Sequence, residues 1–156
     1  MWGRGPSIGI YGTHEDYDRA CHPGDWIPTE FRGLGWVEVD ETTALALELD
    51  CYTQFLRLSP LEGVLFRAGL DCVTEWDVRA TLARIEQRSW QRLPRPFVLA
   101  TGRFFVFDAA FAGAKSLAEF DGGAFAMECE LAPGAYDVFV AAVDGIDVIK
   151  LVAQIP

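Results

Sequence analysis

The chain has 156 residues, 51% of them hydrophobic and 23% charged, a composition typical of one globular domain and not of a disordered chain. Its net charge of −10, from 23 acidic and 13 basic residues, argues against binding to nucleic acid or to an anionic membrane, because both require a positive surface. A chain of this length buries enough surface to fold without a metal or a disulfide.

The cysteines and the start of the chain predict a cytoplasmic protein. The four cysteines form no CxxC or other close pair, so we expect reduced thiols and no zinc site; they are Cys21, Cys51, Cys72 and Cys129. The N-terminal residues lack the apolar core of a signal peptide. The longest unbroken apolar run, Val138–Val143, is too short to span a bilayer.

The N-terminal part of the chain is predicted to be irregular apart from two short elements. A strand is expected near Ser7–Tyr11 and a short helix over Glu15–Cys21. Pro23 and Gly24 end that helix, because this dipeptide favours a turn. The following residues, Gly24–Gly35, are predicted to form a loop.

Strand patterns dominate the next segment. They cover Trp36–Asp40, Ala44–Asp50, Cys51–Leu58 and Val64–Ala68, with a polar turn at Asp40–Thr43. In the second of these strands, three leucines alternate with small or charged residues, and this period of two indicates a half-buried strand. The alternating leucines are Leu45, Leu47 and Leu49.

Val73–Trp90 has the one long helical pattern of the sequence. Thr74 is a good N-cap, and Asp77 lies at the capping-box position. The apolar residues recur at spacings of four and three, which places them on one stripe: Val78, Leu82 and Ile85. The pattern predicts a principal helix over about residues 74–89 that packs on a β-structure formed by the rest of the chain.

The last third has the strongest strand patterns. Phe97–Ala100 and Arg103–Phe107 flank Thr101 and Gly102, which predicts a tight hairpin. In Ala124–Leu131, apolar residues alternate with acids. One face is Phe125, Met127, Cys129 and Leu131, and the other is marked by Glu128 and Glu130. A turn is expected at Pro133-Gly134, and a second hairpin joins Ala135–Val143 to Ile146–Ile155 across Asp144-Gly145.

Together these elements predict an α+β fold in a single domain over residues 1–156. We expect a mostly antiparallel β-sheet or sandwich of about eight to ten strands. One principal helix, over about residues 74–89, and a short N-terminal helix are expected to accompany it.

The sequence predicts no enzyme, no cofactor and no metal site. It contains no GxSxG, HExxH, P-loop or GxGxxG motif, and only two histidines. His14, Asp18 and His22 would share one helix face and could hold a divalent metal if the helix extended that far. Because Pro23 and Gly24 interrupt that turn, a solvated helix face is the favoured interpretation.

The acidic charge lies on both sides of the predicted principal helix. Residues 1–70 have 11 acids and 5 bases, a net −6, and residues 104–156 have 8 acids and 2 bases, again −6. Residues 71–103 have 4 acids and 6 bases, a net +2. The basic side chains there are interpreted as surface ion-pair partners and not as a phosphate site.

Several short motifs follow one another along nearly the whole chain. They are Trp2, Gly5 and Pro6; DYDRAC at Asp16–Cys21; GDWI at Gly24–Ile27; ALALELD at Ala44–Asp50; LFRAGLDCVTEWDV at Leu65–Val78; and FVFDAAFAGA and CELAPGAYDVFV in the tail. In this order they resemble the immunity protein 21 family, predicted antidotes in bacterial polymorphic toxin systems. The resemblance implies a stoichiometric inhibitor that binds a toxin domain made by the same cell.

The charge is compatible with such a partner. An acidic domain without catalytic motifs suits docking on a basic toxin, such as a nuclease. The expected interface combines acids and aromatic anchors of the N-terminal part with two acids at a turn: Asp16, Tyr17, Asp18, Asp25, Trp26, Asp40 and Glu41. The alternative is a small-molecule-binding β domain without catalysis, in which aromatic C-terminal strands line a pocket.

Overall fold

The protein is mostly antiparallel β-sheet with little helix. The computed structural model describes residues 26–27, 34–39, 42–47, 52–68, 78–86, 90–107, 126–143 and 145–155. Within this part the elements are β1 (Trp26–Ile27), β2 (Leu34–Val39), β3 (Thr42–Leu47), β4 (Tyr52–Ser59), β5 (Glu62–Ala68), α2 (Val78–Glu86), β6 (Gln91–Arg92), β7 (Phe97–Leu99), β8 (Arg103–Phe107), β9 (Ala126–Glu130), β10 (Gly134–Val143) and β11 (Ile146–Ala153). In these ranges, no helix is long and apolar enough to cross a membrane.

The main sheet is built around the β10–β11 hairpin. Its strand order is β4–β5–β11–β10–β6, and β7 also pairs with β10. Every pairing in it is antiparallel. The hairpin register begins at Val143 and Ile146 and runs without a shift to Tyr136 and Ala153.

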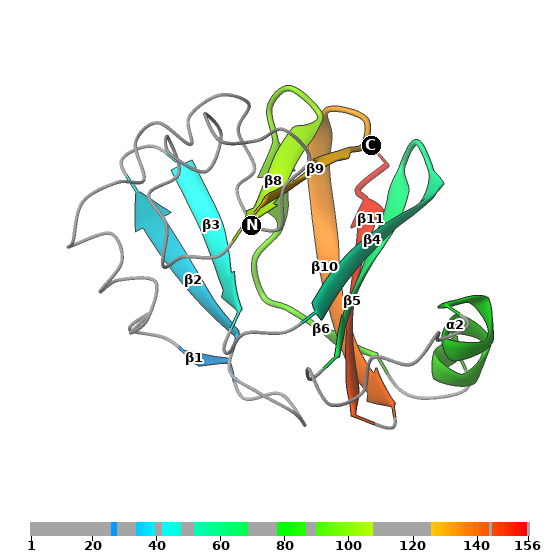
Figure 1. Ribbon diagram of the computed structural model, residues 1–156. Helices are drawn as coiled ribbons and strands as arrows, with labels where there is room; N and C mark the ends of the chain where they lie inside the picture. The colour runs from blue at the N-terminus through cyan, green and yellow to red at the C-terminus, as the bar shows by residue number, and fades with distance from the viewer. Residues whose placement is uncertain are drawn as a thin grey trace.

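A second layer faces the main sheet. It contains the antiparallel sheet β1–β2–β3 and the two-stranded ribbon β8–β9. In Figure 1, β2 and β3 lie on one side of the molecule, the main sheet lies on the other, and β8 and β9 lie between them. The described strands thus form a sandwich-like arrangement with α2 beyond the main sheet.

The inner core fills the space between these layers. Alternate residues of the strands point into it, as the period-two pattern of a β-strand requires. Its buried members are Leu45, Leu65, Leu93, Phe97, Leu99, Phe104, Cys129, Leu131, Tyr136, Val138, Val140, Ile149 and Leu151. The ring of Phe104 meets those of Phe55 and Phe97 edge to face, with centroid distances of 5.3 Å and 6.0 Å. Such pairs add to the stabilisation that burial alone provides.

The opposite face of the main sheet forms a smaller outer core with α2. Val64 and Phe66 of β5 and Val148 of β11 are buried there against Ile85 of the helix. Leu82 and Trp90 are partly buried at the same place. Because β5 sends Leu65 to the inner core and its two neighbours to the outer core, both faces of this strand are buried.

The turns near β7, β9 and β10 are tied together by hydrogen bonds. The backbone N–H of Leu131 donates to the carbonyl of Gly102 at 2.8 Å, and that of Ala132 donates to the carbonyl of Pro60 at 2.7 Å. The fully buried Tyr136 hydroxyl donates to the carbonyl of Ala132 at 2.5 Å. These bonds join the ends of several strands at one end of the main sheet.

The structure confirms most of the predicted β-elements. The alternation in β9 is as expected, because Cys129 is buried while Glu128 and Glu130 are exposed. The Asp144-Gly145 hairpin prediction is confirmed by the Val143–Ile146 pairing. Two strands were not predicted: β1 lies in the expected loop, and β6 follows the principal helix. Each has only two residues, too few for a sequence pattern.

The principal helix is present over Val78–Glu86. Ile85 is buried and Leu82 is half-buried, which agrees with the predicted stripe. The predicted ends of this helix near Thr74 and residue 89 lie outside the described residues, as do the N-terminal helix over Glu15–Cys21 and the strand near Ser7–Tyr11.

One pairing prediction was wrong. Phe97–Ala100 and Arg103–Phe107 do not form a hairpin with each other, because β7 pairs with β10 and β8 pairs with β9. Gly102 has φ +78° and makes the turn, but the turn takes the chain from the main sheet to the second layer. A glycine turn between two apolar strands is compatible with either geometry, so the local sequence does not distinguish them.

Two glycines provide a matched test of this crossing turn. Gly102 and Gly145 have φ +78° and +80°, so alanine at either costs roughly 1–2 kcal/mol. At Gly102 an added Cβ would also lie 2.3 Å from the carbonyl oxygen of Leu131, whereas nothing lies within 4 Å at Gly145. We expect Gly102→Ala to lower the free energy of unfolding by about 1 kcal/mol more than Gly145→Ala in urea titrations. Equal losses would show that the Leu131 carbonyl does not constrain the turn.

Candidate interaction surface

The structure describes only one of the predicted interface residues. Trp26 lies in β1, where it pairs with Gly35 of β2. The strands on either side of the predicted polar turn pair antiparallel, since Val39 and Thr42 are Cα partners. The other six residues lie outside the described part: Asp16, Tyr17, Asp18, Asp25, Asp40 and Glu41. Their proximity to one another therefore stays a prediction.

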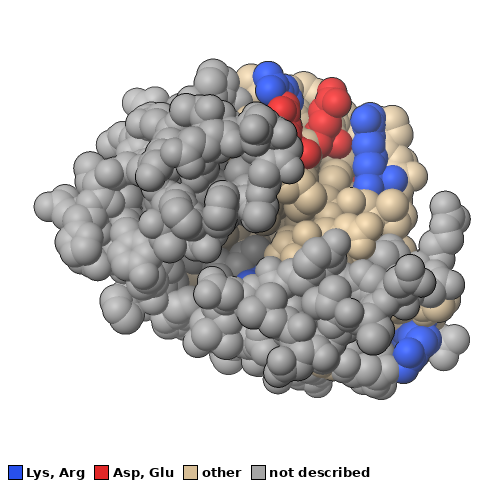
Figure 2. Space-filling model, in the orientation of Figure 1, with Lys and Arg blue, Asp and Glu red and all other residues tan. Residues whose placement is uncertain are grey.

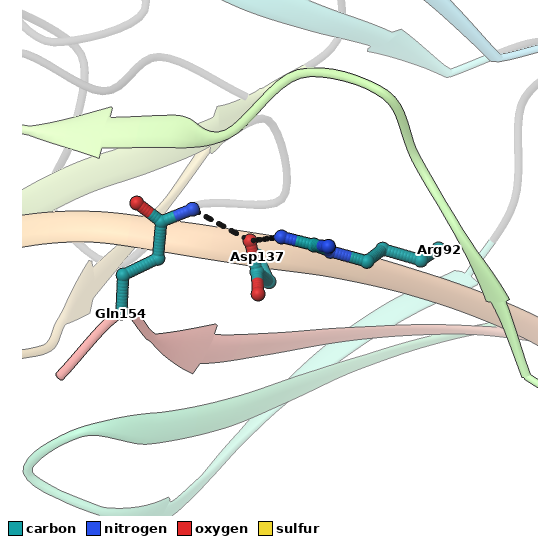
Figure 3. Close-up of polar contacts among 3 residues, drawn as sticks. All are labelled: Arg92, Asp137 and Gln154. Carbon is teal, nitrogen blue, oxygen red and sulfur yellow. Dashed lines mark hydrogen bonds and ion pairs between the residues drawn. The ribbon is translucent and has the colours of Figure 1, made fainter.

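A polar cluster lies on the outer face of the main sheet, on the same side as α2. Arg92 and Gln154 each donate a hydrogen bond to Oδ1 of Asp137, and both bonds are 2.7 Å long (Figure 3). Asp137 pairs with Val152 in the β10–β11 register, while Arg92 pairs with Phe139. The carboxylate thus lies diagonally opposite both donors and joins β6, β10 and the segment after β11.

This cluster changes the acidity of its carboxyl group. The hydrogen bond from Arg92, followed by that from Gln154, lowers the pKa of Asp137 below its ordinary value. Both donors favour the ionised form, because a protonated carboxyl oxygen is a poorer acceptor. The Arg92 side chain remains 59% exposed and that of Asp137 24% exposed, so the ion pair is open to solvent on one side.

A lysine next to this cluster lies over two aromatic rings. Lys150 Nζ is 4.5 Å from the ring centroid of Trp90 and 5.9 Å from that of Phe139. Phe139 is the cross-strand partner of both Lys150 and Arg92, so the three side chains form one row across β6, β10 and β11. An ammonium at this distance from an indole face is stabilised by the ring quadrupole.

Exposed apolar side chains gather at one end of the main sheet. The exposed large hydrophobic residues of the described part are Leu58 (43%), Leu61 (45%), Val98 (56%) and Ile155 (81%). The N–H of Ala153 donates to the Leu61 carbonyl, and that of Gln154 donates to the Ala135 carbonyl, whose residue pairs with Val98. These backbone contacts place the β4–β5 turn, β7 and the C-terminal segment beside one another.

Charged side chains of both signs lie at this end of the molecule. Acidic and basic side chains lie side by side at the upper rim of the face in Figure 2. On the outer side of the β8–β9 ribbon, Arg103 forms an ion pair with Glu128 and lies 6.0 Å from the ring centroid of Phe105. The surface therefore combines apolar side chains with ion pairs, as the rim of a protein–protein interface does.

The inner face of the main sheet carries polar residues at its other end. Arg67 of β5 is only 4% exposed and pairs in register with Thr53 of β4 and Asp147 of β11. On β2, the buried Nε1 of Trp36 has no hydrogen-bond partner among the residues that the structure describes, although this side chain packs on the inner core. A buried donor without an acceptor is costly.

Neither a reactive thiol nor a metal cluster is found in the described ranges. Burial raises the pKa of the Cys129 thiol to about 12, so it stays protonated and packs as a small apolar residue. The described ranges contain no group of three or more histidine, cysteine, aspartate or glutamate side chains placed to hold a metal ion. The predicted His14–Asp18–His22 alternative lies outside them.

The chain has no match in three comparisons with known proteins. No protein-family model, no curated protein and no solved structure matches the chain.

Sequence reasoning identified none of the residues of the outer polar cluster. The Asp144-Gly145 hairpin predicts the Asp137–Val152 pairing, from which a diagonal contact of Asp137 with Gln154 follows. The contact with Arg92 could not be derived in this way, because β6 reaches β10 from a distant part of the chain.

The Asp137 cluster predicts a defined acid response. Because its pKa is lowered in the folded state, the stabilisation is present above the ordinary aspartate pKa of about 3.9 and is lost as pH falls through the lower folded value. We expect Asp137→Asn to lower the urea midpoint at neutral pH and to approach the wild type as the pH falls below about 4. The matched control is Gln154→Ala, which keeps both charges and should keep most of the acid dependence. A wild-type advantage that does not vary with pH would contradict this assignment.

Proposed function

We propose that this chain is an immunity protein that binds a cognate bacterial toxin domain and neutralises it. It acts by stoichiometric binding and not by catalysis, and its working site is the cytoplasm, where the toxin is made. The proposal takes its partner class from a resemblance: short motifs along nearly the whole chain are similar to those of the immunity protein 21 family.

The net charge of −10 is the observation on which the proposal depends. An excess of acid this large on a domain of 156 residues attracts a basic protein and speeds its diffusional encounter. A toxin that acts on nucleic acid carries the complementary positive surface. Acidic side chains of the immunity protein would then occupy the place of phosphates in the toxin's cleft.

The described surface supports a protein partner in a second way. It offers partly exposed Trp90, Phe139 and Arg92, residue types that contribute strongly to protein interfaces. They lie on a sheet supported by cores on both faces, so little ordering is needed when a partner binds.

The N-terminal acids provide the direct test. Replacing Asp16, Asp18 and Asp25 together by alanine should weaken growth protection when the adjacent reading frame is expressed as the toxin. The association rate should fall with added salt for the wild type and less steeply for the triple variant. The control removes two exposed acids of β9 by Glu128→Ala and Glu130→Ala. Full protection by a folded triple variant would exclude this site, and an association rate indifferent to salt would exclude the electrostatic part.

A second candidate function is the binding of a small molecule between the two layers. It is favoured by the buried Nε1 of Trp36, a donor without an acceptor among the described residues, on a side chain that packs against the inner core. A ligand with a carboxylate or carbonyl oxygen would satisfy the indole N–H.

Thermal denaturation with a panel of small carboxylates distinguishes this function. A ligand of the inner core should raise the melting temperature of the wild type by several degrees at saturating concentration. Trp36→Phe keeps an aromatic ring but removes the donor, so it should abolish most of that shift. If no compound raises the melting temperature, or if Trp36→Phe responds like the wild type, this second function is wrong.

A further inference from the structure

The helix α2 covers the outer core with few side chains. It spans nine residues, and in Figure 1 it is the one labelled element on the outer side of the main sheet. Among its residues 80–85, Thr81 and Ile85 are buried, Leu82 is half-buried, and the other three are exposed. A helix shorter than about 12 residues is marginal in water by itself, so α2 depends on the side chains that it buries.

The sheet beneath α2 is held by interactions that do not involve the helix. Val64 and Phe66 of β5 and Val148 of β11 face Ile85 of α2. The same two strands pair with each other and send the alternate residues, such as Leu65, into the inner core. Because the strand pairing and the inner core persist without α2, the sheet would keep most of its packing if the helix moved away.

A cation–π contact joins the chain after the helix to the sheet. Trp90 is half-buried against the outer core, and the Nζ atom of Lys150 on β11 lies 4.5 Å from its ring centroid. In the part of the chain that the structure describes, no carboxylate forms an ion pair with this lysine. The ring of Trp90 is therefore a principal partner of the ammonium, and the contact opposes movement of the chain that leads back to α2.

The residues that follow Trp90 are fixed to the sheet. Gln91 and Arg92 form β6 and pair with β10, and the Arg92 side chain donates a hydrogen bond to Asp137 (Figure 3). The N–H of Leu93 donates to the carbonyl of Val138 at 2.8 Å, and the Leu93 side chain is buried in the inner core. A displacement of α2 would therefore end at β6.

We propose that α2 is a lid that opens away from the main sheet while the sheet and the inner core stay folded. The hinge is β6, and the contact between Trp90 and Lys150 is the latch. Opening uncovers Val64, Phe66 and Val148 and frees the ammonium of Lys150. The lid is independent of the proposed function, because it follows from how the helix packs and not from the identity of a partner.

Amide hydrogen exchange of the full chain, measured over a series of low urea concentrations, tests the lid. The amides of residues 82–86 should exchange through one common opening, at least about tenfold more populated than the one that exposes residues 64–66 of β5. Its population should rise only weakly with urea, because little surface is exposed when a single helix leaves the sheet. The amide of Leu93, at the hinge, is the internal control and should stay as protected as those of β5.

Two substitutions of one residue test the latch. Lys150→Met removes the ammonium but keeps a long apolar side chain, so the opening of α2 should become about two- to fivefold more populated relative to that of β5. Lys150→Arg keeps a cation over the ring and should behave like the wild type.

Two results would overturn the proposal. If the amides of α2 and β5 exchange at the same rate with the same urea dependence, the helix and the sheet unfold together and there is no lid. If α2 exchanges equally in Lys150→Met and Lys150→Arg, the cation does not hold the helix closed and the latch is wrongly assigned. The first result needs only the wild type, so it is decisive even if a variant fails to fold.

Discussion

The burial of the main sheet on both faces is the constraint on which the rest of the structure depends. Along β5, Leu65 enters the inner core while Val64 and Phe66 enter the outer core beneath α2. Because side chains alternate along a strand, a slip of one residue would exchange the two sets. The inner core accepts large side chains from the second layer, and the outer core is closed by one short helix, so the two are not interchangeable. Register, helix position and layer order are thus fixed together.

This constraint limits where the described part can meet a partner. Residues at the centre of β5 and β11 are committed to the two cores and cannot change without destabilising both. The outer face that bears Asp137 and Lys150 and the end where the turns meet are among the surfaces of the described part that carry no such commitment. Each of these is rigid, because it is formed by strands that are held elsewhere. A binding surface of this kind loses little entropy when it is covered.

The sequence predicted the elements better than their arrangement. Alternation and turn residues are local, so β9, the β10–β11 hairpin and the buried stripe of α2 followed from the chain itself. The position of β7 did not, because the turn at Gly102 is equally suited to a hairpin and to a crossing between layers. The Arg92–Asp137 pair was missed for a related reason: it joins residues 45 apart, and only the observed sheet order brings them together.

Three basic side chains of the described part have local partners within the fold. Arg92 is paired with Asp137, Arg103 with Glu128, and Lys150 lies over aromatic rings. These cations are therefore compensated locally, and at a distance the molecule presents the field of its excess acids. A field of one sign raises the rate at which an oppositely charged protein is encountered, whichever side chains it then contacts.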